Sequence, residues 1–256
     1  ENQGVRGLEL DLHWDARCGR LRVYHLPSLD DRSSCDLFTD CLTLVRRWSD
    51  AHPSHHPLFL NIEPKDAWTD AEAAARLDAM DREILSVFPR SLVITPDEVK
   101  GDAATVADGV RTRAWPTLRA SRGRVLFYID RTDNLRTVYT HGGRDLDARV
   151  AFVDSAASDP FAGVLVLNNP RHADLAAAVR ANFLVRVSIW GAGSRMDPSD
   201  VQAALDSGAQ IISTDYPVPI TNVTTGVSIP GGTPSRCNPV TAPMGCTSAL
   251  VEQLSR

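Results

Sequence analysis

The sequence contains no apolar stretch that approaches the roughly 18 residues needed to cross a bilayer, so no membrane-spanning helix is predicted. It also lacks a block of lysines and arginines, and its formal net charge is -5, so nothing predicts binding to nucleic acid. Internal repeats and low-complexity linkers are absent, which favours one domain over residues 1–256. With 43% hydrophobic and 23% charged residues, the chain has ample material for a globular core.

The first residues lack the features of a natural start. Residues 1–7 run straight into the apolar alternation of a strand, and a domain seldom opens this way. We therefore expect further sequence upstream of Glu1, and the lack of a signal peptide carries no weight.

The five cysteines are few, and their spacing predicts disulfides. Cys237 and Cys246 lie in a Pro/Gly/Thr-rich tail over residues 218–256, where a disulfide would supply order that no helix or strand pattern provides. Cys35 and Cys41 are close enough to close a second short loop, which leaves Cys18 over. The alternative is five free thiols in a cytosolic protein. The disulfide interpretation favours a secreted, extracellular protein, and a chance-prone glycosylation triplet at Asn222 adds little to it.

Short apolar runs alternate with helical patterns, which predicts βα units and a parallel sheet. Roughly six or seven strands of this kind, where a TIM barrel has eight, predict an irregular α/β TIM-like barrel whose first strand is missing from this chain. The expected strands are 7–13, 20–25, 58–62, 125–130, 163–167, 184–188 and 210–214, and the expected helices are 38–49, 69–88, 173–182 and 198–207.

Polar side chains alternate along two of the expected strands. Glu9 and Asp11 fall at every second position of the first strand, so both carboxylates point to one face, and His13 shares that face. Glu63 and Lys65 alternate in the same way at the end of the third strand. Inward carboxylates are costly to bury without a cation or partners, so these strands predict a site at their carboxyl ends.

The predicted site has the composition of a hard-metal centre. Glu9, Asp11 and Glu63 offer carboxylate oxygens suited to Ca²⁺ or Mg²⁺, and His25 ends the second strand, where it can act as an acid, a base or a donor to a developing charge. The alternative for each carboxylate is a structural ion pair with Lys65 or Arg6. The order Glu-x-Asp, His, Asn-x-Glu-x-Lys favours the functional interpretation. Four other histidines are expected in turns or at the surface: His13, His52, His55 and His56.

Several segments together carry a family resemblance. Gly4-Val-Arg-Gly-Leu-Glu-Leu-Asp11, Val23-Tyr-His25 and Leu60-Asn-Ile-Glu-Pro-Lys65 resemble the phosphatidylinositol-phosphodiesterase superfamily, which includes phospholipases C, glycerophosphodiester phosphodiesterases and sphingomyelinase-D-like toxins. Segments 92–99, 122–127, 207–217 and 236–239 resemble the Ca²⁺-dependent bacterial-type phosphatidylinositol phospholipase C family.

This resemblance implies a calcium-assisted phosphodiesterase. The metal, Ca²⁺ rather than Mg²⁺, would be held by Glu9, Asp11 and Glu63, with His25 as the second catalytic histidine. The inositol 2-hydroxyl would attack phosphorus and release diacylglycerol and a cyclic inositol phosphate. The expected partners are a phospholipid headgroup and, transiently, a membrane surface, with the protein a monomer. The residues expected to contact the phosphate or the headgroup are Lys65, Arg124, Arg186, Asp215 and Tyr216, with Asp215 alternatively a loop cap.

Other interpretations stay open at this point. The family's first catalytic histidine, followed by an asparagine ligand, is expected on the strand before Gly4 and therefore upstream. A glycerophosphodiesterase or sphingomyelinase-D-like enzyme would use the same metal site and His25, and an inactive relative would only bind headgroups. A glycosidase with Glu9 and Glu63 as its carboxylate pair is disfavoured by the neighbouring Asp11 and His25.

Overall fold

The computed structural model describes residues 4–30, 33–189, 197–217, 227, 229 and 235–252. The triplet at Asn222 and part of the 218–256 tail lie outside these residues. The chain divides into two compact units, one formed by Leu8–Gly163 and the other by Glu1–Gly7 with Val164–Arg256. Each unit is described by itself.

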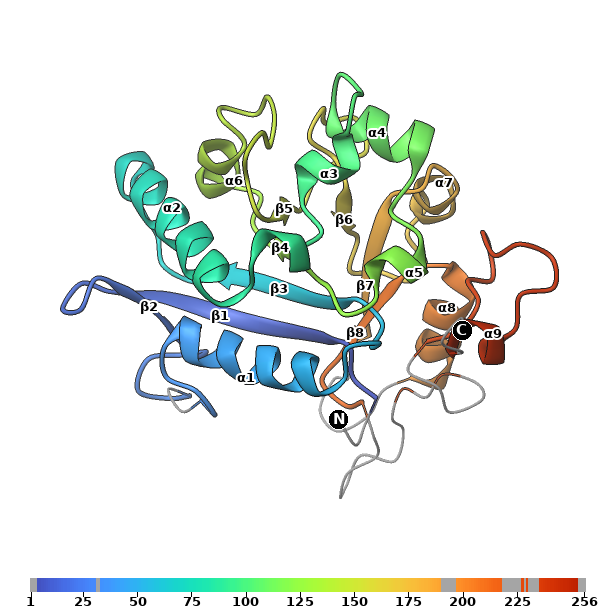
Figure 1. The fold of residues 1–256 in the computed structure, drawn as a ribbon, viewed down its shortest axis with the longest axis horizontal. Helices are drawn as coiled ribbons and strands as arrows, with labels where there is room; N and C mark the ends of the chain where they lie inside the picture. The colour runs from blue at the N-terminus through green and yellow to red at the C-terminus, as the bar shows by residue number, and fades with distance from the viewer. Residues whose placement is uncertain are drawn as a thin grey trace. The chain divides into compact units, whose positions relative to one another are not determined.

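The first unit is built on a five-stranded sheet with the order β2-β1-β3-β4-β5 (Figure 1). β1 (Gly7–Asp15) and β2 (Arg20–Val23) form an antiparallel hairpin. β3 (Leu58–Pro64), β4 (Val125–Ile129) and β5 (Phe152–Val153) run parallel to one another. The four longer strands were predicted. β5 was not, because two residues are too few to show a period.

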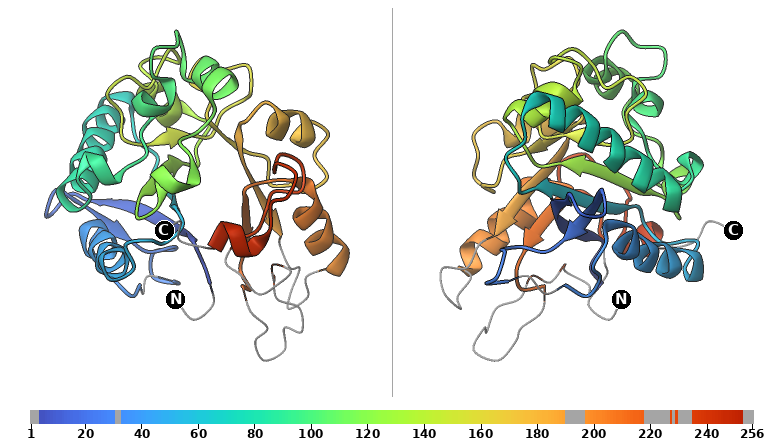
Figure 2. Two further views of the ribbon diagram at one scale, coloured as in Figure 1. Left: turned by 45° about the vertical axis from the view of Figure 1, so that its right-hand side comes forward. Right: turned by 90° about the vertical axis from the view of Figure 1, so that its left-hand side faces the viewer.

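Helices of the first unit connect and cover these strands. α1 (Phe38–Ala51) and α2 (Asp70–Val87) lie beside each other (Figure 2) and bury leucines such as Leu42 and Leu77. The Thr69 hydroxyl caps α2 by accepting the Glu72 N–H, as its place before the helix predicted. The shorter elements were not predicted: η1 (Arg90–Leu92), α3 (Pro96–Lys100), α4 (Val106–Arg113), α5 (Leu118–Ser121) and α6 (Asn134–Tyr139).

The second unit contains a parallel sheet with the order β6-β7-β8. Its strands are β6 (Val164–Val166), β7 (Leu184–Ile189) and β8 (Ile211–Thr214), and its helices are α7 (Leu175–Arg180), α8 (Pro198–Ser207) and α9 (Ser248–Glu252). α8 ends at Gly208 as predicted. That residue has φ +81°, and a β-carbon there would lie 2.5 Å from Val240 Cγ2, so only glycine fits without rearrangement.

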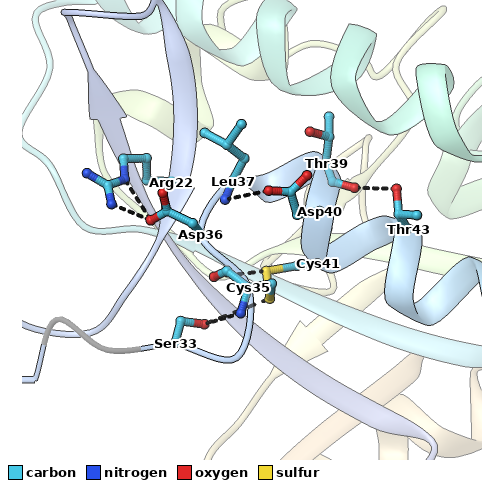
Figure 3. Close-up of a disulfide and its surroundings, with 9 residues drawn as sticks. All are labelled: Arg22, Ser33, Cys35, Asp36, Leu37, Thr39, Asp40, Cys41 and Thr43. Carbon is cyan, nitrogen blue, oxygen red and sulfur yellow. Dashed lines mark hydrogen bonds and ion pairs between the residues drawn. A yellow bond between two sulfur atoms is a disulfide. The ribbon is translucent and has the colours of Figure 1, made fainter.

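Both predicted disulfides are present, and the alternative of five free thiols is wrong. Cys35 bonds to Cys41 and Cys237 to Cys246, while Cys18 is free and exposed. Figure 3 shows the first bridge joining the segment before α1 to the first turn of that helix. The adjacent Asp36 pairs with Arg22 of β2, so this segment is tied to the sheet as well as to the helix. Among the described residues, no helix is both long and apolar enough to cross a membrane.

Asp81 of α2 carries a mostly buried carboxyl that faces Tyr139 of α6. The Tyr139 hydroxyl donates to Asp81 Oδ1 at 2.6 Å, and Arg149 Nη1 lies 3.5 Å from Asp81 Oδ2. Burial raises the pKa of Asp81 to about 6, because desolvation outweighs the hydrogen bond from Tyr139 and the charge of Arg149.

We expect Asp81 to make stability fall as the pH rises. Between the unfolded pKa of 3.8 and the folded pKa of about 6, the folded state keeps a proton that the unfolded state has lost. The contribution is therefore complete below the unfolded pKa and is lost as the pH rises through the folded one. A shift of about two units corresponds to roughly 3 kcal/mol. Denaturant unfolding of wild type and Asp81→Asn at about pH 4 and about pH 7 measures it. A difference between the two proteins that does not change with pH would contradict the prediction.

Candidate functional site

Three carboxylates from adjacent strands meet in the first unit. Glu9 and Asp11 of β1 and Glu63 of β3 each place an oxygen within 4.8 Å of the others. The strands bring them together because β1 and β3 are neighbours, and the Lys65 N–H donates to Leu12 O at 2.9 Å near the carboxyl end of β3. The alternation along each strand then turns the acidic side chains to one face.

Lys65 lies among these carboxylates. Its Nζ is 2.8 Å from Glu63 Oε2 and 3.2 Å from Asp11 Oδ1. Partial burial works against the charged form, but the hydrogen bonds to Glu63 and Asp11 outweigh it and raise the pKa of Lys65 above its usual value. The ammonium therefore offsets part of the negative charge of the cluster.

Asn61 supports the cluster from within β3. Its side chain is 3% exposed, and Nδ2 donates to Glu9 Oε2 at 2.8 Å and to Asp130 Oδ2 at 3.5 Å. Its Oδ1 is buried and has no hydrogen-bond partner among the described residues. The strand pattern placed Asn61 on the face of Glu63. The contribution of Asp130 depends on the pairing of β3 with β4 and was missed.

His25 lies on the loop that leaves β2. The preceding residue, Tyr24, donates its N–H to Asp11 O at 3.2 Å, which places His25 one residue from the strand that carries Glu9 and Asp11. Its imidazole is 51% exposed, and Nδ1 is 3.3 Å from Asp30 Oδ2. The imidazole is therefore accessible from solvent.

His13 differs from its expected place. It lies within β1, in agreement with the expected strand 7–13, but the expectation of a turn or surface position is wrong, because it is only 6% exposed. Its Nδ1 is 2.7 Å from Asp66 Oδ1, a partner 53 residues away that no local pattern indicates. His55 and His56 lie in a loop but are also buried, with 7% and 8% exposure.

Arg124 lies away from the carboxylate cluster. It precedes β4, and its guanidinium pairs with Glu98, with Nη1 2.8 Å from Oε1. Since β3 and β4 are parallel, with Leu58 opposite Val125, the start of β4 lies at the opposite end of the sheet from Lys65. We therefore leave Arg124 out of the site. The sequence could have excluded Arg124, because it precedes a strand, whereas active sites of this fold lie at the carboxyl ends of the strands.

The remaining predicted residues belong to the second unit and are described within it. Arg186 of β7 is 5% exposed, and it donates to Asn168 Oδ1 and, at 3.1 Å, to Ser213 Oγ. Asp215 is exposed and Tyr216 is half-buried, directly after β8. Asp215 and Tyr216 follow the carboxyl end of β8, whereas Arg186 lies within β7, opposite Val166 at the end of β6.

Comparison with known proteins gives one matching family model and several similar solved structures. Residues 19–239 match the family model of Ca²⁺-dependent phosphoinositide phospholipase C. No curated protein matches the chain. Among solved structures, a Ca²⁺-dependent phosphatidylinositol-specific phospholipase C from Streptomyces antibioticus is similar, with a TM-score of 0.65 and 20% identity over 84% of this chain and 87% of that one.

A second solved structure supports the same fold. The calcium-dependent phosphoinositol-specific phospholipase C of a Gram-negative Pseudomonas sp. has a TM-score of 0.64 and 20% identity, covering 90% of this chain and 84% of that one. These likenesses confirm the predicted α/β fold class, that of the TIM-like phospholipase C barrels. The family model spans most of the sequence. The chain therefore belongs to the Ca²⁺-dependent phosphoinositide phospholipase C family, whose members are phosphodiesterases.

Proposed function

We propose that this protein cleaves phosphatidylinositol to diacylglycerol and a cyclic inositol phosphate, with Ca²⁺ held by Glu9, Asp11 and Glu63. The observation that carries the proposal is the convergence of these three carboxylates beside Lys65 in a chain of this family. The family match runs through residues of both units, which supports the prediction that they form one phosphodiesterase domain.

The residues present fit a calcium ion. Calcium takes oxygen ligands in flexible geometry, and the cluster offers three carboxylates. Asn61, whose Nδ2 donates to Glu9 Oε2, carries one more oxygen, a buried Oδ1 with no partner among the described residues. Bound calcium would lower the pKa of the attacking hydroxyl and offset the charge that grows on the phosphoryl oxygens.

The side chains of the site would have separate roles in the reaction. The inositol 2-hydroxyl gives up its proton to a base as its oxygen forms a bond to phosphorus. The bond from phosphorus to the diacylglycerol oxygen breaks, so the leaving oxygen needs a proton. We assign His25 to deliver that proton or to stabilise the charge by donation. Lys65 would contact a phosphoryl oxygen, where a cation interacts more strongly as charge develops. We propose Arg186, Asp215 and Tyr216 as contacts to the inositol headgroup.

The test is hydrolysis of phosphatidylinositol by the full-length protein, with calcium present and with calcium chelated. Calcium-dependent release of a cyclic inositol phosphate supports the proposal. Glycerol phosphate or a cyclic lipid phosphate as the product would assign it to another phosphodiester. If the folded protein binds headgroups but cleaves none of these substrates, it is an inactive binding protein.

The loop after His25 supports a membrane-facing role for this side of the first unit. Leu29 is 87% exposed and Leu26 is 44% exposed. Backbone hydrogen bonds close the turn: the Asp30 N–H donates to Leu26 O at 2.9 Å and the His25 N–H donates to Asp30 O at 3.2 Å. Exposed leucines on a hydrogen-bonded turn beside the proposed catalytic His25 are suited to lipid contact.

We expect Leu29→Ser to weaken binding to phosphatidylinositol vesicles by roughly ten- to a hundredfold, because transfer of one leucine into an apolar phase contributes about 1.5–3 kcal/mol. Hydrolysis of vesicles should fall in parallel, while hydrolysis of a monomeric short-chain substrate stays unchanged. Leu44→Ser is the matched control, since Leu44 is 48% exposed on α1. Equal vesicle binding by wild type and Leu29→Ser would show that the turn does not contact lipid.

We also propose that the protein is secreted and acts as a monomer. The two disulfides support export, because disulfides persist in oxidising compartments.

A further inference from the structure

A buried histidine beside the proposed site has no part in the chemistry above. His13 is 6% exposed, and its Nδ1 is 2.7 Å from Asp66 Oδ1. The other carboxylate oxygen of Asp66 accepts the Trp14 N–H at 2.7 Å and the Trp68 indole N–H at 3.3 Å. Asp66 is therefore held by three donors, and it holds the ring of His13 in turn.

The opposite edge of the His13 ring reaches the loop that carries His25. Nε2 lies 3.4 Å from the carbonyl oxygen of His25. The ring also stacks on Tyr24, with centroids 3.9 Å apart and planes 4° apart. One imidazole thus contacts both the backbone of His25 and the side chain of the residue before it.

We propose that His13 and Asp66 are positioning residues for His25, a role that rests on the proposed function. Asp66 directly follows Lys65, and His13 lies two residues after Asp11, so the pair links the two strands of the carboxylate cluster to the His25 loop. The side chain of His25 is 51% exposed, and its partner Asp30 lies on the same exposed loop. Its placement therefore depends on the backbone beneath it.

The alternative is that His13 is a core residue whose hydrogen bonds have only a structural role. A phenylalanine would fill the same space and stack on Tyr24 without buried polar atoms, which are costly to bury. It would lack the two directed contacts, to Asp66 and to the His25 carbonyl. The substitutions must therefore change one of these two contacts at a time.

Two substitutions of His13 divide its contacts. His13→Asn keeps a polar group near Nδ1, facing Asp66, and removes the contact with His25. His13→Gln reaches the place of Nε2, where its amide N–H can donate to the His25 carbonyl. Asp66→Asn keeps an acceptor for the tryptophan donors and changes the group that faces His13. The matched control is Asp145→Asn, which alters another histidine–aspartate pair. In that pair, just after α6, His141 Nδ1 lies 2.6 Å from Asp145 Oδ1.

The measurements are kcat and KM on phosphatidylinositol, the calcium Kd by titration calorimetry, and amide hydrogen exchange over residues 24–30. We expect His13→Asn and Asp66→Asn to lower kcat about 10- to 100-fold, with KM and the calcium Kd within about twofold of wild type. Exchange over 24–30 should become about tenfold faster, with no change in β3 and β4. His13→Gln should keep more of kcat than His13→Asn, and Asp145→Asn should match wild type.

Wild-type kcat and exchange in folded His13→Asn would overturn the proposal. So would a parallel loss of calcium binding, because the pair would then act through the metal ligands rather than through His25. The exchange measurement needs no turnover. If the wild type cleaves no phosphodiester, the proposed function fails, and unchanged exchange over 24–30 would still decide against the positioning role.

Discussion

Glu63→Gln is expected to lower kcat/KM on phosphatidylinositol by roughly a thousandfold. A bound metal supplies several kcal/mol of charge stabilisation in the transition state, and this substitution removes one of three carboxylates that would hold it. Glutamine keeps the size of the side chain, so the fold should persist. Lys65 would also lose its shorter ion pair, the 2.8 Å contact to Glu63 Oε2.

Calorimetry separates loss of the metal from loss of fold. We expect the calcium Kd of Glu63→Gln to rise at least about tenfold, because the charge and number of ligands set calcium affinity. Glu98→Gln is the matched control: it alters the carboxylate that pairs with Arg124 at the opposite end of the sheet. Wild-type turnover by Glu63→Gln would remove the proposed metal site, and a large loss in Glu98→Gln would return Arg124 to consideration.

His25→Ala is expected to lower kcat by about a hundred- to ten-thousandfold, the usual contribution of a positioned acid or base. The calcium Kd should stay unchanged, because His25 lies on the loop after β2 and not among the three carboxylates. For Glu63→Gln, in contrast, calcium binding and turnover are expected to fall together. Steady-state kinetics and calorimetry on the same preparations measure both.

The control for His25 is another partly exposed histidine of the first unit. His141 pairs with Asp145 and is 34% exposed, so His141→Ala makes the same change in side chain away from the cluster. We expect its kcat to equal that of wild type. If His25→Ala keeps wild-type kcat, the proton that the leaving oxygen needs must come from another group, and the assignment of His25 is wrong.

Much of the fold was predictable because its signals are local. Thr69 stands immediately before a long helical pattern, and its hydroxyl caps α2 in the structure. Gly208 stands after α8 and has the positive φ that ends a helix. The cysteines lie six and nine residues apart in the two bridges, so sequence spacing alone indicated the pairs. The short helices α3 to α6 were missed, because one or two turns do not establish a helical period.

Local alternation also determined which acidic side chains share a face. A strand turns every second residue to the same side, so Glu9 with Asp11, and separately the face of Glu63, could be read from spacing. The sequence alone could not decide that these faces meet, because that depends on β1 and β3 being neighbours in the sheet. For the same reason, the sequence favoured Lys65 as a phosphate contact but left a structural ion pair open.

Only the tertiary structure decided the surroundings of His13 and Arg124. The environment of His13 is made by Asp66 and Tyr24, which are brought to it by strand pairing and by the β1–β2 hairpin. Arg124 is paired with Glu98, 26 residues earlier in the chain. Periodicity determines the direction of a side chain from its own strand, whereas its partners depend on how separate strands pack, and that information is not local.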